Sequence, residues 1–432
     1  MKTINIGILG MGTVGSGVVK ILQEQQGLLD RRVGAKLRIK RVAVRRPRPD
    51  GDPTLLTTDP MEVVADPQID IVVELIGGTA AARTLCLEAI NRGKHLVTAN
   101  KALLAEHGLE IFQAAAARRV DLGIEASVCG AIPILRSVRE GLVANRIRSI
   151  MGIVNGTTNY ILTKMTESGQ AFADVLAEAQ AKGYAEADPT LDVGGIDAAH
   201  KLQILASLAY NGYVHFPDIH VEGIQKVEAV DVEFARELGC RIKLLAIAKE
   251  EQGELEVRVQ PTMIPETHFL ALVGGVYNAV LLRGDSAGSL MFSGRGAGQM
   301  PTASSVVADV VEIAHNIVFR RPSRVSLLPT APMADEGIRI RPIERIRSRY
   351  YLRIMAVDKP GVLSRVSGVL GEHHISIATM LQKGRAEQAA VPIVMLTHEA
   401  VEGDMQKALK RINHLDVVAQ DAAVCRMEGI ED

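Results

Sequence analysis

The sequence predicts an α/β protein with a doubly wound parallel sheet, a second α+β region and a C-terminal βαββαβ unit. Three observations lead to this prediction. From Thr3 to about Val128, short β-branched runs alternate with longer amphipathic segments, which is typical of a parallel sheet with crossover helices. From about residue 130 to 342, helical segments mix with further strands. From Tyr350 onward, the order is strand, helix, strand, strand, helix, strand.

Composition narrows the class of protein. The chain has 432 residues, 47% of them hydrophobic, and its 49 basic side chains nearly balance 50 acidic ones. This balance disfavours a dedicated nucleic-acid binder, which needs a basic surface. No apolar run reaches the ~18 residues of a membrane helix, and the N-terminal segment lacks a signal-peptide cleavage site. The four cysteines are scattered without a C-x-x-C pair. We expect a cytoplasmic protein with reduced thiols and neither nucleic acid nor membrane as a partner.

The first segment contains five candidate strands. They are the runs INIGIL, LRIKRVAV, IDIVVELI, HLVTAN and DLGIEASV. Asp59-Pro60 marks a helix start between two of them, because an acid caps free N–H groups and proline lacks the N–H that would be unpaired at the first helical position. We place the first domain at 1–129, with residues 296–342 returning to it.

The rest of the chain divides into three stretches. Residues 130–330 include the candidate strands RSIMGIV, LLAIAKE, LEVRVQP and YNAVLL, and form the predicted second domain. Residues 331–349 are rich in Pro and Arg and suit an exposed linker. Residues 350–427 form the last unit, with strands in YYLRIMAV, ISIATMLQ, AAVPIVMLTHE and VVAQDAAVCRM and helices in GVLSRVSGVLGEHH and DMQKALKRINHL.

A glycine-rich turn supplies the first chemical signal. The motif GMGTVG follows a predicted strand directly and precedes a helix-like segment. Gly10 permits the tight turn, Gly12 lets a pyrophosphate approach the backbone, and Gly15 lets the helix pack close to the strand. The alternative is an ordinary glycine turn, but the strand–turn–helix context favours a Rossmann-type dinucleotide site.

The end of the second strand indicates which dinucleotide binds. An acid there would contact the ribose of NAD, whereas a cation would pair with the 2′-phosphate of NADP. Here the strand ends in Arg45-Arg46 with no carboxylate, and arginine forms charge-assisted, bidentate bonds to phosphate. We therefore expect NADP, with NAD as the alternative cofactor. The competing interpretation is that both arginines are solvated surface residues.

Two further motifs carry candidate catalytic groups. Lys101 follows the end of a predicted sheet strand, where α/β sheets bind ligands, although it could equally be a surface lysine at a helix start. Asp197 and Lys201 are four residues apart and so share a helix face, just after the acidic loop GYAEADP (183–189). A buried Asp/Lys pair there could bind a zwitterion and move a proton, whereas an isolated i,i+4 pair is most often a solvated helix support.

Together these motifs resemble those of homoserine dehydrogenases. The matching segments are the GMGTVG turn, TANKALL (98–104), EASVCGAIPI (125–134), GIVNGTTNYIL (152–162), GYAEADPTLDVGGIDAAHKLQIL (183–205) and GAGQMPTASSVVADV (296–310). The C-terminal unit, with DKPGVL (358–363), resembles an ACT domain, a small-molecule sensing module of amino-acid metabolism. The resemblance implies the single-function, ACT-bearing form of the enzyme.

The resemblance also implies the reaction and a role for each domain. The reaction is the NAD(P)-dependent interconversion of L-aspartate 4-semialdehyde and L-homoserine (EC 1.1.1.3), on the route to threonine, methionine and isoleucine. Residues 1–129 would bind NAD(P), 130–330 would bind substrate and form a dimerisation surface, 331–349 would be the linker, and 350–427 the regulatory ACT-like domain. Threonine at the ACT domain is the implied effector, and a homodimer or homotetramer the implied assembly.

Individual residues acquire roles by matching the family's motifs. Lys201 resembles the proton donor, Asp197 its partner that also contacts substrate, and Lys101 a residue at the nicotinamide end of the cofactor that assists proton transfer. Glu186 resembles the residue that binds the ammonium group of the substrate. Further matches to cofactor-binding positions are Thr13, Val14, Gly183 and Gly298. Glu125, with the carbonyl oxygens of Val128, Gly130 and Ile132, resembles a structural sodium site, and a hard cation suits such oxygen ligands.

Two alternatives remain open from sequence. Cys129 could be the thiol nucleophile of a phosphorylating aldehyde dehydrogenase, which acts on the same semialdehyde, but its motif contains no histidine to activate it. The other interpretation of Cys129 is a small buried side chain. The nucleotide domain and ACT-like unit could also form a sensor that catalyses nothing.

Overall fold

The structure, a computed structural model, describes residues 2–46, 54–321, 338–382 and 390–429. These residues form two compact units that interleave along the chain. The first unit comprises Met1–Ile150, Asp197–Pro217 and Tyr277–Ile338, and the second comprises Met151–Ile196, Asp218–Val276 and Arg339–Asp432. Sequence analysis had instead divided the chain into consecutive segments, apart from the return of 296–342 to the first domain.

The first unit is built on a six-stranded parallel sheet. Its strands are β1 (Thr3–Leu9), β2 (Lys36–Ala43), β3 (Leu56–Thr57), β4 (Ile71–Glu74), β5 (His95–Thr98) and β6 (Leu122–Gly123). Their order across the sheet is β3-β2-β1-β4-β5-β6, which is the doubly wound order of Rossmann domains. The predicted doubly wound parallel sheet is therefore confirmed.

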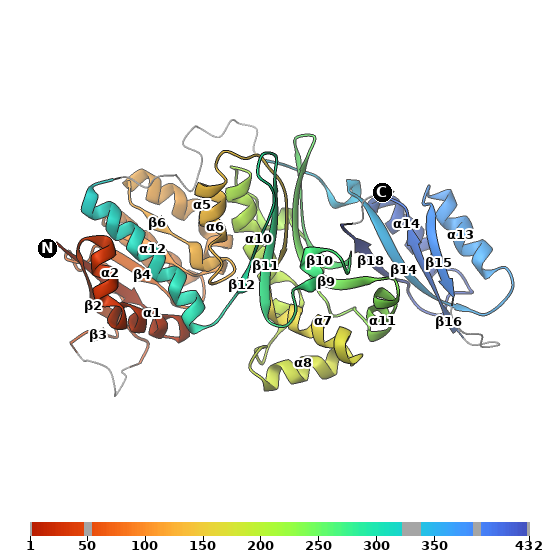
Figure 1. Cartoon of the computed structure of the whole chain (residues 1–432), viewed down its shortest axis with the longest axis horizontal. Coiled ribbons are helices and arrows are strands. Elements are labelled where there is room, and N and C mark those ends of the chain that lie inside the picture. Colours follow the sequence, from red (N-terminus) through yellow and green to blue (C-terminus); the bar gives the residue numbers. More distant parts are fainter. Residues whose placement is uncertain (1, 47–53, 322–337, 383–389, 430–432) are drawn as a thin grey trace. The chain divides into compact units, whose positions relative to one another are not determined.

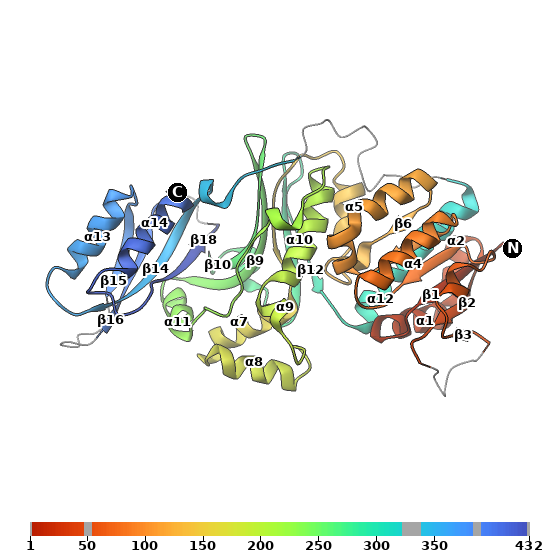
Figure 2. The same ribbon diagram turned by 180° about the vertical axis from the view of Figure 1, so that it is seen from behind.

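Helices cover both faces of this sheet. On one face lie α1 (Thr13–Glu24), α2 (Gln26–Val33) and α12 (Gln299–Phe319), and on the other α4 (Ala80–Asn91) and α5 (Lys101–Arg118) (Figures 1 and 2). A fully buried aliphatic core of β1, β4 and α12 side chains fills the space between the first face and its helices. α12 is long and apolar enough to cross a membrane, but its inward face packs on this core, as expected of the core helix of a globular domain.

Short elements complete the first unit. α3 (Met61–Val64) begins one residue later than the Asp-Pro signal predicted, with Pro60 as its N-cap, and Asp59 accepts a hydrogen bond from the N–H of Met61 at 2.8 Å. The run DLGIEASV was predicted as one strand, but β6 spans only two residues and a 3-10 turn, η1 (Glu125–Ser127), follows. The strand stops because the N–H of Glu125 donates to the Asp309 carboxylate at 2.9 Å instead of joining the sheet. The remaining elements are α6 (Ile134–Arg136), η2 (Ser137–Gly141), η3 (Phe216–Asp218), β11 (Tyr277–Gly284) and β12 (Gly288–Arg295).

Three elements run from one unit into the other along the chain. These are β7 (Ile147–Ile153), α10 (Ile196–Ala209) and η3, whose last residue belongs to the second unit. The second unit then contributes the helices α7 (Gly156–Ser168), α8 (Phe172–Ala181), α9 (Thr190–Val193) and α11 (Ala229–Glu237), with the 3-10 turn η4 (Phe269–Leu272). Its sheet starts with the long antiparallel pair β9 (Cys240–Glu251) and β10 (Glu254–Pro265), while β8 (His220–Val221) lies parallel to β10.

The C-terminal module has the predicted order of strands and helices. It consists of β14 (Arg347–Val357), α13 (Val362–Glu372), β15 (Ile377–Gln382), β16 (Ala390–Thr397), β17 (Ala400–Val401), α14 (Glu402–Asn413) and β18 (Ala423–Met427). The two helices pack with the sheet around one aliphatic core. The βαββαβ arrangement is therefore confirmed, with β17 as a short addition.

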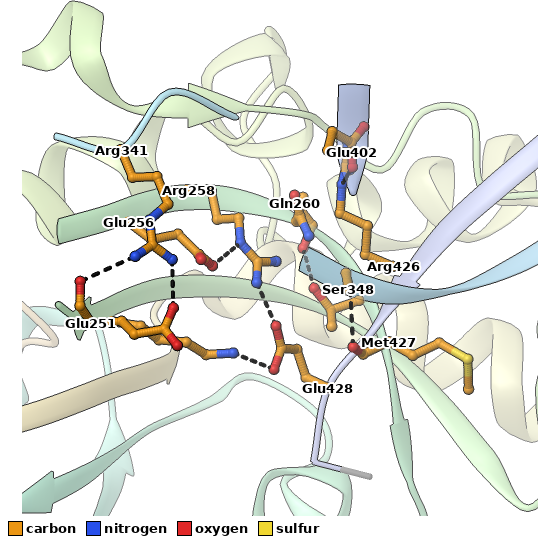
Figure 3. A network of polar contacts seen from close by, with 12 residues as sticks. Glu251, Glu256, Arg258, Gln260, Arg341, Ser348, Glu402, Arg426, Met427 and Glu428 are labelled. Atoms are coloured by element: carbon orange, nitrogen blue, oxygen red, sulfur yellow. Dashed lines mark hydrogen bonds and ion pairs between the residues drawn. The ribbon is translucent and has the colours of Figure 1, made fainter. Parts of the chain in front are cut away.

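The C-terminal strand joins this module to the preceding sheet. β18 pairs antiparallel with β14 on one side and parallel with β10 on the other, so the sheet order within the second unit is β9-β10-β18-β14-β16-β15. A buried ion pair crosses this junction, from Arg258 on β10 to Glu428 just after β18, while Glu256 binds the same guanidinium from β10 itself (Figure 3). Sequence analysis did not predict this shared strand.

The predicted linker is partly ordered. Residues 331–337 lie outside the described residues, but β13 (Arg339–Ile340) pairs with β10, η5 (Ile343–Arg345) follows, and β14 already begins at Arg347. Arg341 is held by ion pairs to Glu251 at 2.5 Å and Glu254 at 3.2 Å. Arg341 and Arg345 therefore attach the described part of this stretch to the β9–β10 hairpin, while most of its side chains are exposed or half-buried.

Candidate active site

The glycine turn between β1 and α1 has the shape required for a dinucleotide. Gly10 has φ +97°, and a Cβ there would lie 2.6 Å from the carbonyl oxygen of Leu75. A Cβ on Gly15 would lie 2.2 Å from the carbonyl oxygen of Gly10, whereas one on Gly12 would meet nothing within 4 Å. The first and third glycines thus permit close packing, while the middle one leaves the backbone open to an approaching phosphate.

The helix that follows presents its N-terminus at this turn. α1 begins at Thr13, with Val14 and Gly15 next, and its N-cap Gly12 has no side chain to cap the first N–H groups. Such N–H groups and the helix dipole bind anions. Gly298 is the N-cap of α12 with φ 116°. α12 packs so closely on α1 that a Cβ on Gly17 would lie 2.9 Å from the carbonyl oxygen of Gln299.

Arg45 and Arg46 are exposed and follow β2 after one buried residue, Val44. They stand at the carboxyl end of the sheet, because β2 is parallel to β1 and the N–H of Gly10 donates to the carbonyl oxygen of Ala43 at 2.9 Å. This edge is where a doubly wound sheet binds the ribose of a dinucleotide. Both guanidinium groups are therefore available to an anion from solvent.

One carboxylate joins the two candidate catalytic lysines. Asp197 accepts from the Lys101 Nζ at 2.9 Å through one oxygen and from the Lys201 Nζ at 2.7 Å through the other. Asp197 and Lys201 leave only 7% and 11% of their side chains exposed, while Lys101 leaves 41%. The i,i+4 pair is therefore buried, contrary to the interpretation of a solvated helix support. A site with two ammonium groups on one carboxylate can stabilise a developing negative charge and donate a proton.

A buried acid that sequence analysis missed supports the helix of Lys101. Glu74 ends β4 and accepts from the hydroxyl of Thr98 at 2.5 Å and the N–H of Ile76 at 2.8 Å. Burial raises the pKa of Glu74 to about 7, although these hydrogen bonds oppose the shift. Asn100 caps α5 by accepting from the N–H of Leu103 at 3.1 Å. The sequence signal that could have identified Glu74 is an acidic residue inside the apolar run IDIVVELI.

The residues of the predicted sodium site share one buried turn. Glu125 accepts from the N–H groups of Leu135 at 3.0 Å and Arg136 at 2.8 Å, and burial raises its pKa. Gly130 adopts φ +51°, and its carbonyl oxygen accepts from Ser305 at 2.8 Å. Among the described residues no cluster of three or more His, Cys, Asp or Glu side chains could hold a metal ion. A site here would therefore depend on main-chain carbonyls with one buried carboxylate, a set of oxygen donors that fits a hard cation.

Cys129 lies in the same turn and is fully buried. Burial raises the pKa of its thiol to about 11, and the nearby charge of Lys201 only partly offsets this effect. A nucleophilic cysteine needs an accessible thiolate. The thiol-nucleophile interpretation is therefore not supported, and Cys129 behaves as a small buried side chain.

The remaining candidates, Gly183 and Glu186, belong to the second unit. They lie on the exposed loop after α8, which is held from within the unit: Gln180 donates to the carbonyl oxygens of Glu186 at 3.1 Å and Ala187 at 3.3 Å. Asp192, at the end of the same motif, accepts from the Asn155 amide at 2.7 Å. The structure thus brings Lys101, Asp197 and Lys201 together in the first unit. The Glu186 loop belongs to the second unit, and the contacts given above for it lie within that unit.

Comparison with known proteins identifies the family. Models of the homoserine dehydrogenase catalytic region, its NAD-binding domain and the ACT domain match residues 133–311, 10–125 and 350–416. The homoserine dehydrogenases of Neisseria gonorrhoeae and Pseudomonas aeruginosa are 45% and 47% identical, each over 100% of both chains. The crystal structure of a homoserine dehydrogenase from Thiobacillus denitrificans superposes with a TM-score of 0.93 at 46% identity over 99% of both chains.

The chain belongs to the homoserine dehydrogenase family. It is thus an NAD(P)-dependent oxidoreductase (EC 1.1.1.3) with a Rossmann-like cofactor domain and a C-terminal ACT domain, as the sequence motifs had implied. The interpretation as a sensor without catalysis is wrong for this family. A solved archaeal homoserine dehydrogenase mutant that is 27% identical and aligns with 74% of this chain, at a TM-score of 0.62, is described as a complex with NADPH.

Proposed function

We propose that Lys201 is the proton donor of this homoserine dehydrogenase and that Asp197 and Lys101 orient it. The observation that carries the proposal is the Asp197 carboxylate bound by both ammonium groups, at 2.9 and 2.7 Å. When bound, the reduced nicotinamide supplies the hydride for the aldehyde carbon. Lys201 gives a proton to the oxygen that becomes the hydroxyl, and takes it back in the oxidation of homoserine. Asp197 keeps the ammonium of Lys201 in place while substrate enters.

We propose that NADP is the preferred cofactor. The glycine turn and the uncapped start of α1, with Thr13, Val14 and Gly15, would hold the pyrophosphate, and Gly298 and Gly183 would add backbone contacts. The support for NADP over NAD is that Arg45 and Arg46 are exposed after β2 and that the described residues from Ala43 to Arg46 include no acid. Glu186 would bind the substrate ammonium.

The proposal extends to a cation, an effector and an assembly. Glu125 and the carbonyls of Val128, Gly130 and Ile132 would hold sodium, which would neutralise a carboxylate that burial disfavours in its charged form. Threonine would act at the ACT domain, the enzyme would form a homodimer or homotetramer, and it would work in the cytoplasm. NADP and NAD assays of homoserine oxidation, with and without threonine and with sodium replaced by choline, test the cofactor, the effector and the cation.

Replacement of Lys201 tests the catalytic assignment. We expect Lys201→Met to lower kcat by about 10²- to 10⁴-fold, the usual contribution of a positioned acid–base group, with little change in the Kd of NADPH. The matched control is Lys182→Met, which removes the lysine of another i,i+4 pair, with Glu178, that is largely exposed. We expect the control to keep nearly full activity. A Lys201→Met enzyme with near-normal kcat would show that another group donates the proton.

A further inference from the structure

Arg426, on the last strand of the ACT domain, binds two carboxylates from different parts of the second unit. Its Nε and Nη2 donate to Glu402 at 2.7 Å each, and its Nη1 donates to Glu222 at 2.9 Å (Figure 3 shows the Glu402 pair). The side chains of Arg426 and Glu402 are 3% and 2% exposed. Glu402 belongs to the ACT domain itself, whereas Glu222 follows β8 in the catalytic region. Arg426 therefore ties the two regions together.

The charge of Glu222 at neutral pH is favoured by its surroundings. Burial would raise the pKa of its carboxyl, but the hydrogen bond from His220 at 2.7 Å and the positive charge of Arg426 hold it at about 2. Its own N–H donates to the carbonyl oxygen of Val259 on β10 at 2.7 Å. Both members of the Glu222–Arg426 pair are therefore charged at neutral pH, and the backbone at Glu222 is fixed to the sheet.

The segment after Glu222 packs directly against a glycine turn. A Cβ on Gly195 would lie 3.3 Å from the carbonyl oxygen of Glu222, and Gly195 has φ +82°. A Cβ on Gly223 would lie 2.3 Å from the carbonyl oxygen of Val193 and 2.7 Å from the Cα of Gly194. The N–H of Ile224 also donates to the carbonyl oxygen of Val193 at 2.8 Å. Because backbone packs on backbone here, and the side chains of Val221 and Gln225 also contact the two glycines, a shift of residues 222–224 would move the turn.

This turn is where the catalytic helix starts. α10 begins at Ile196, directly after Gly195, and the next residue is Asp197. The direction in which α10 leaves the turn determines where Asp197 and, one helical turn later, Lys201 are placed. Displacements of about 1 Å in catalytic groups can lower a rate about 100-fold.

We infer that Arg426 is a positioning residue of the catalytic site: through its ion pair with Glu222, the last ACT strand fixes the glycine turn from which α10 carries Asp197 and Lys201. The inference rests on the proposed roles of those two residues. It makes β18 a support of the active site in addition to a strand of the ACT domain, and it gives a physical route by which changes in the ACT domain reach the reaction.

A second buried arginine provides the control for a purely structural role. Arg353 on β14 binds Asp231 on α11 through Nε at 2.7 Å and Nη2 at 3.0 Å, and its side chain is 2% exposed. It therefore matches Arg426 in residue type, burial and in joining the ACT domain to the catalytic region. Its partner helix, however, lies outside residues 192–224, which contain the glycine turn and the segment packed on it.

The test compares full-length variants in steady-state homoserine oxidation, with melting temperature and NADPH affinity measured in parallel. We expect Arg426→Gln and Arg353→Gln to lower the melting temperature similarly, but only Arg426→Gln to lower kcat, by about tenfold or more, with a smaller change in KM. Arg426→Lys should restore part of the kcat. Glu222→Gln should reproduce the loss, and the double variant Arg426→Gln/Glu222→Gln should be no worse than the more impaired single variant.

Several results would overturn the inference. Equal losses of kcat in Arg426→Gln and Arg353→Gln would indicate general loosening of the ACT domain, and an unchanged kcat in Arg426→Gln would exclude positioning. If Arg426→Gln does not fold, Glu222→Gln decides the question, because its partly exposed side chain keeps its size. Lys201→Met separates the two proposals. If this variant retains activity, the proposed catalytic roles fail. If it is inactive while the Glu222 and Arg426 variants are fully active, only the positioning role fails.

Discussion

At the scale of single residues, Glu74 gives the cofactor domain a measurable pH dependence. A carboxyl whose pKa rises from 4.5 to about 7 on folding binds more protons in the folded than in the unfolded state between these values. Its contribution to stability is therefore complete below pH 4.5 and is lost as the pH rises through 7, by about 3 kcal/mol at most. We expect Glu74→Gln, whose amide stays neutral, to lose less stability between pH 5 and 8 than the unaltered enzyme, as measured by urea unfolding.

The control for this experiment is Glu110→Gln. Glu110 is a partly exposed carboxylate that pairs with Arg83, so its removal should leave the pH dependence of unfolding nearly unchanged over the same range. Asp309, whose pKa burial also raises to about 7, is present in every variant and cancels in the comparison. An identical slope in Glu74→Gln and the unaltered protein would mean that Glu74 stays ionised when folded.

Individual residues also show where sequence analysis reaches its limit. Lys101, Asp197 and Lys201 were found because each stands in a motif, but their shared carboxylate depends on how α5 lies relative to α10, which no local pattern contains. Glu74 carries no motif at all, since its role comes from burial at the end of β4 beside Thr98. Sequence thus supplied the chemistry of the candidate site, whereas the supporting groups required the tertiary structure.

At the scale of elements, the glycines of α1 separate two kinds of constraint. A Cβ on Gly17 would lie 2.9 Å from both the Ala303 Cβ and the Gln299 carbonyl oxygen on α12, whereas one on Gly12 would have open space and a negative φ of −72°. We expect Gly17→Ala to force the two helices apart and lower the free energy of unfolding by about 1–3 kcal/mol. Gly12→Ala should leave stability within about 1 kcal/mol but weaken NADPH binding, because the added methyl group stands where the phosphates approach.

Urea unfolding and fluorescence titration with NADPH distinguish these effects. The pair of variants is its own control, since each carries the same chemical change in the same helix start. Two results would contradict the assignment of Gly17 to helix packing and Gly12 to cofactor binding. One is a loss of NADPH affinity in Gly17→Ala at temperatures where it is fully folded, and the other is a large destabilisation in Gly12→Ala. The doubly wound parallel sheet was predictable from alternating periodicity, but the packing of α12 on α1 joins residues nearly 300 positions apart and was foreseen only as the return of 296–342 to the first domain.

At the scale of the whole molecule, the ACT domain and the catalytic sheet share a strand and a buried ionic network. The order of strands and helices in the ACT domain followed from its sequence pattern. That β18 also pairs with β10 did not, because parallel pairing between strands some 160 residues apart leaves no local signal. The charged residues at this junction would have been taken for surface residues, since charged side chains are seldom fully buried unless they are paired.

Glu428 is the most informative residue of this junction, because it binds both the fully buried Arg258 and, at 2.5 Å, Lys249 (Figure 3). Its replacement by glutamine leaves Arg258 with Glu256 alone, and breaking a buried ion pair by removing one partner commonly costs about 3–5 kcal/mol. We therefore expect Glu428→Gln to lower the free energy of unfolding by about this amount and to increase amide hydrogen exchange in both β10 and β18, because each strand is the other's neighbour in one sheet.

The control is Glu399→Gln, which removes an exposed pair with Arg347 and should cost less than about 1 kcal/mol. Faster exchange confined to β18, with β10 unchanged, would show that the ACT domain opens independently and that the shared strand does not join the two folds into one cooperative unit.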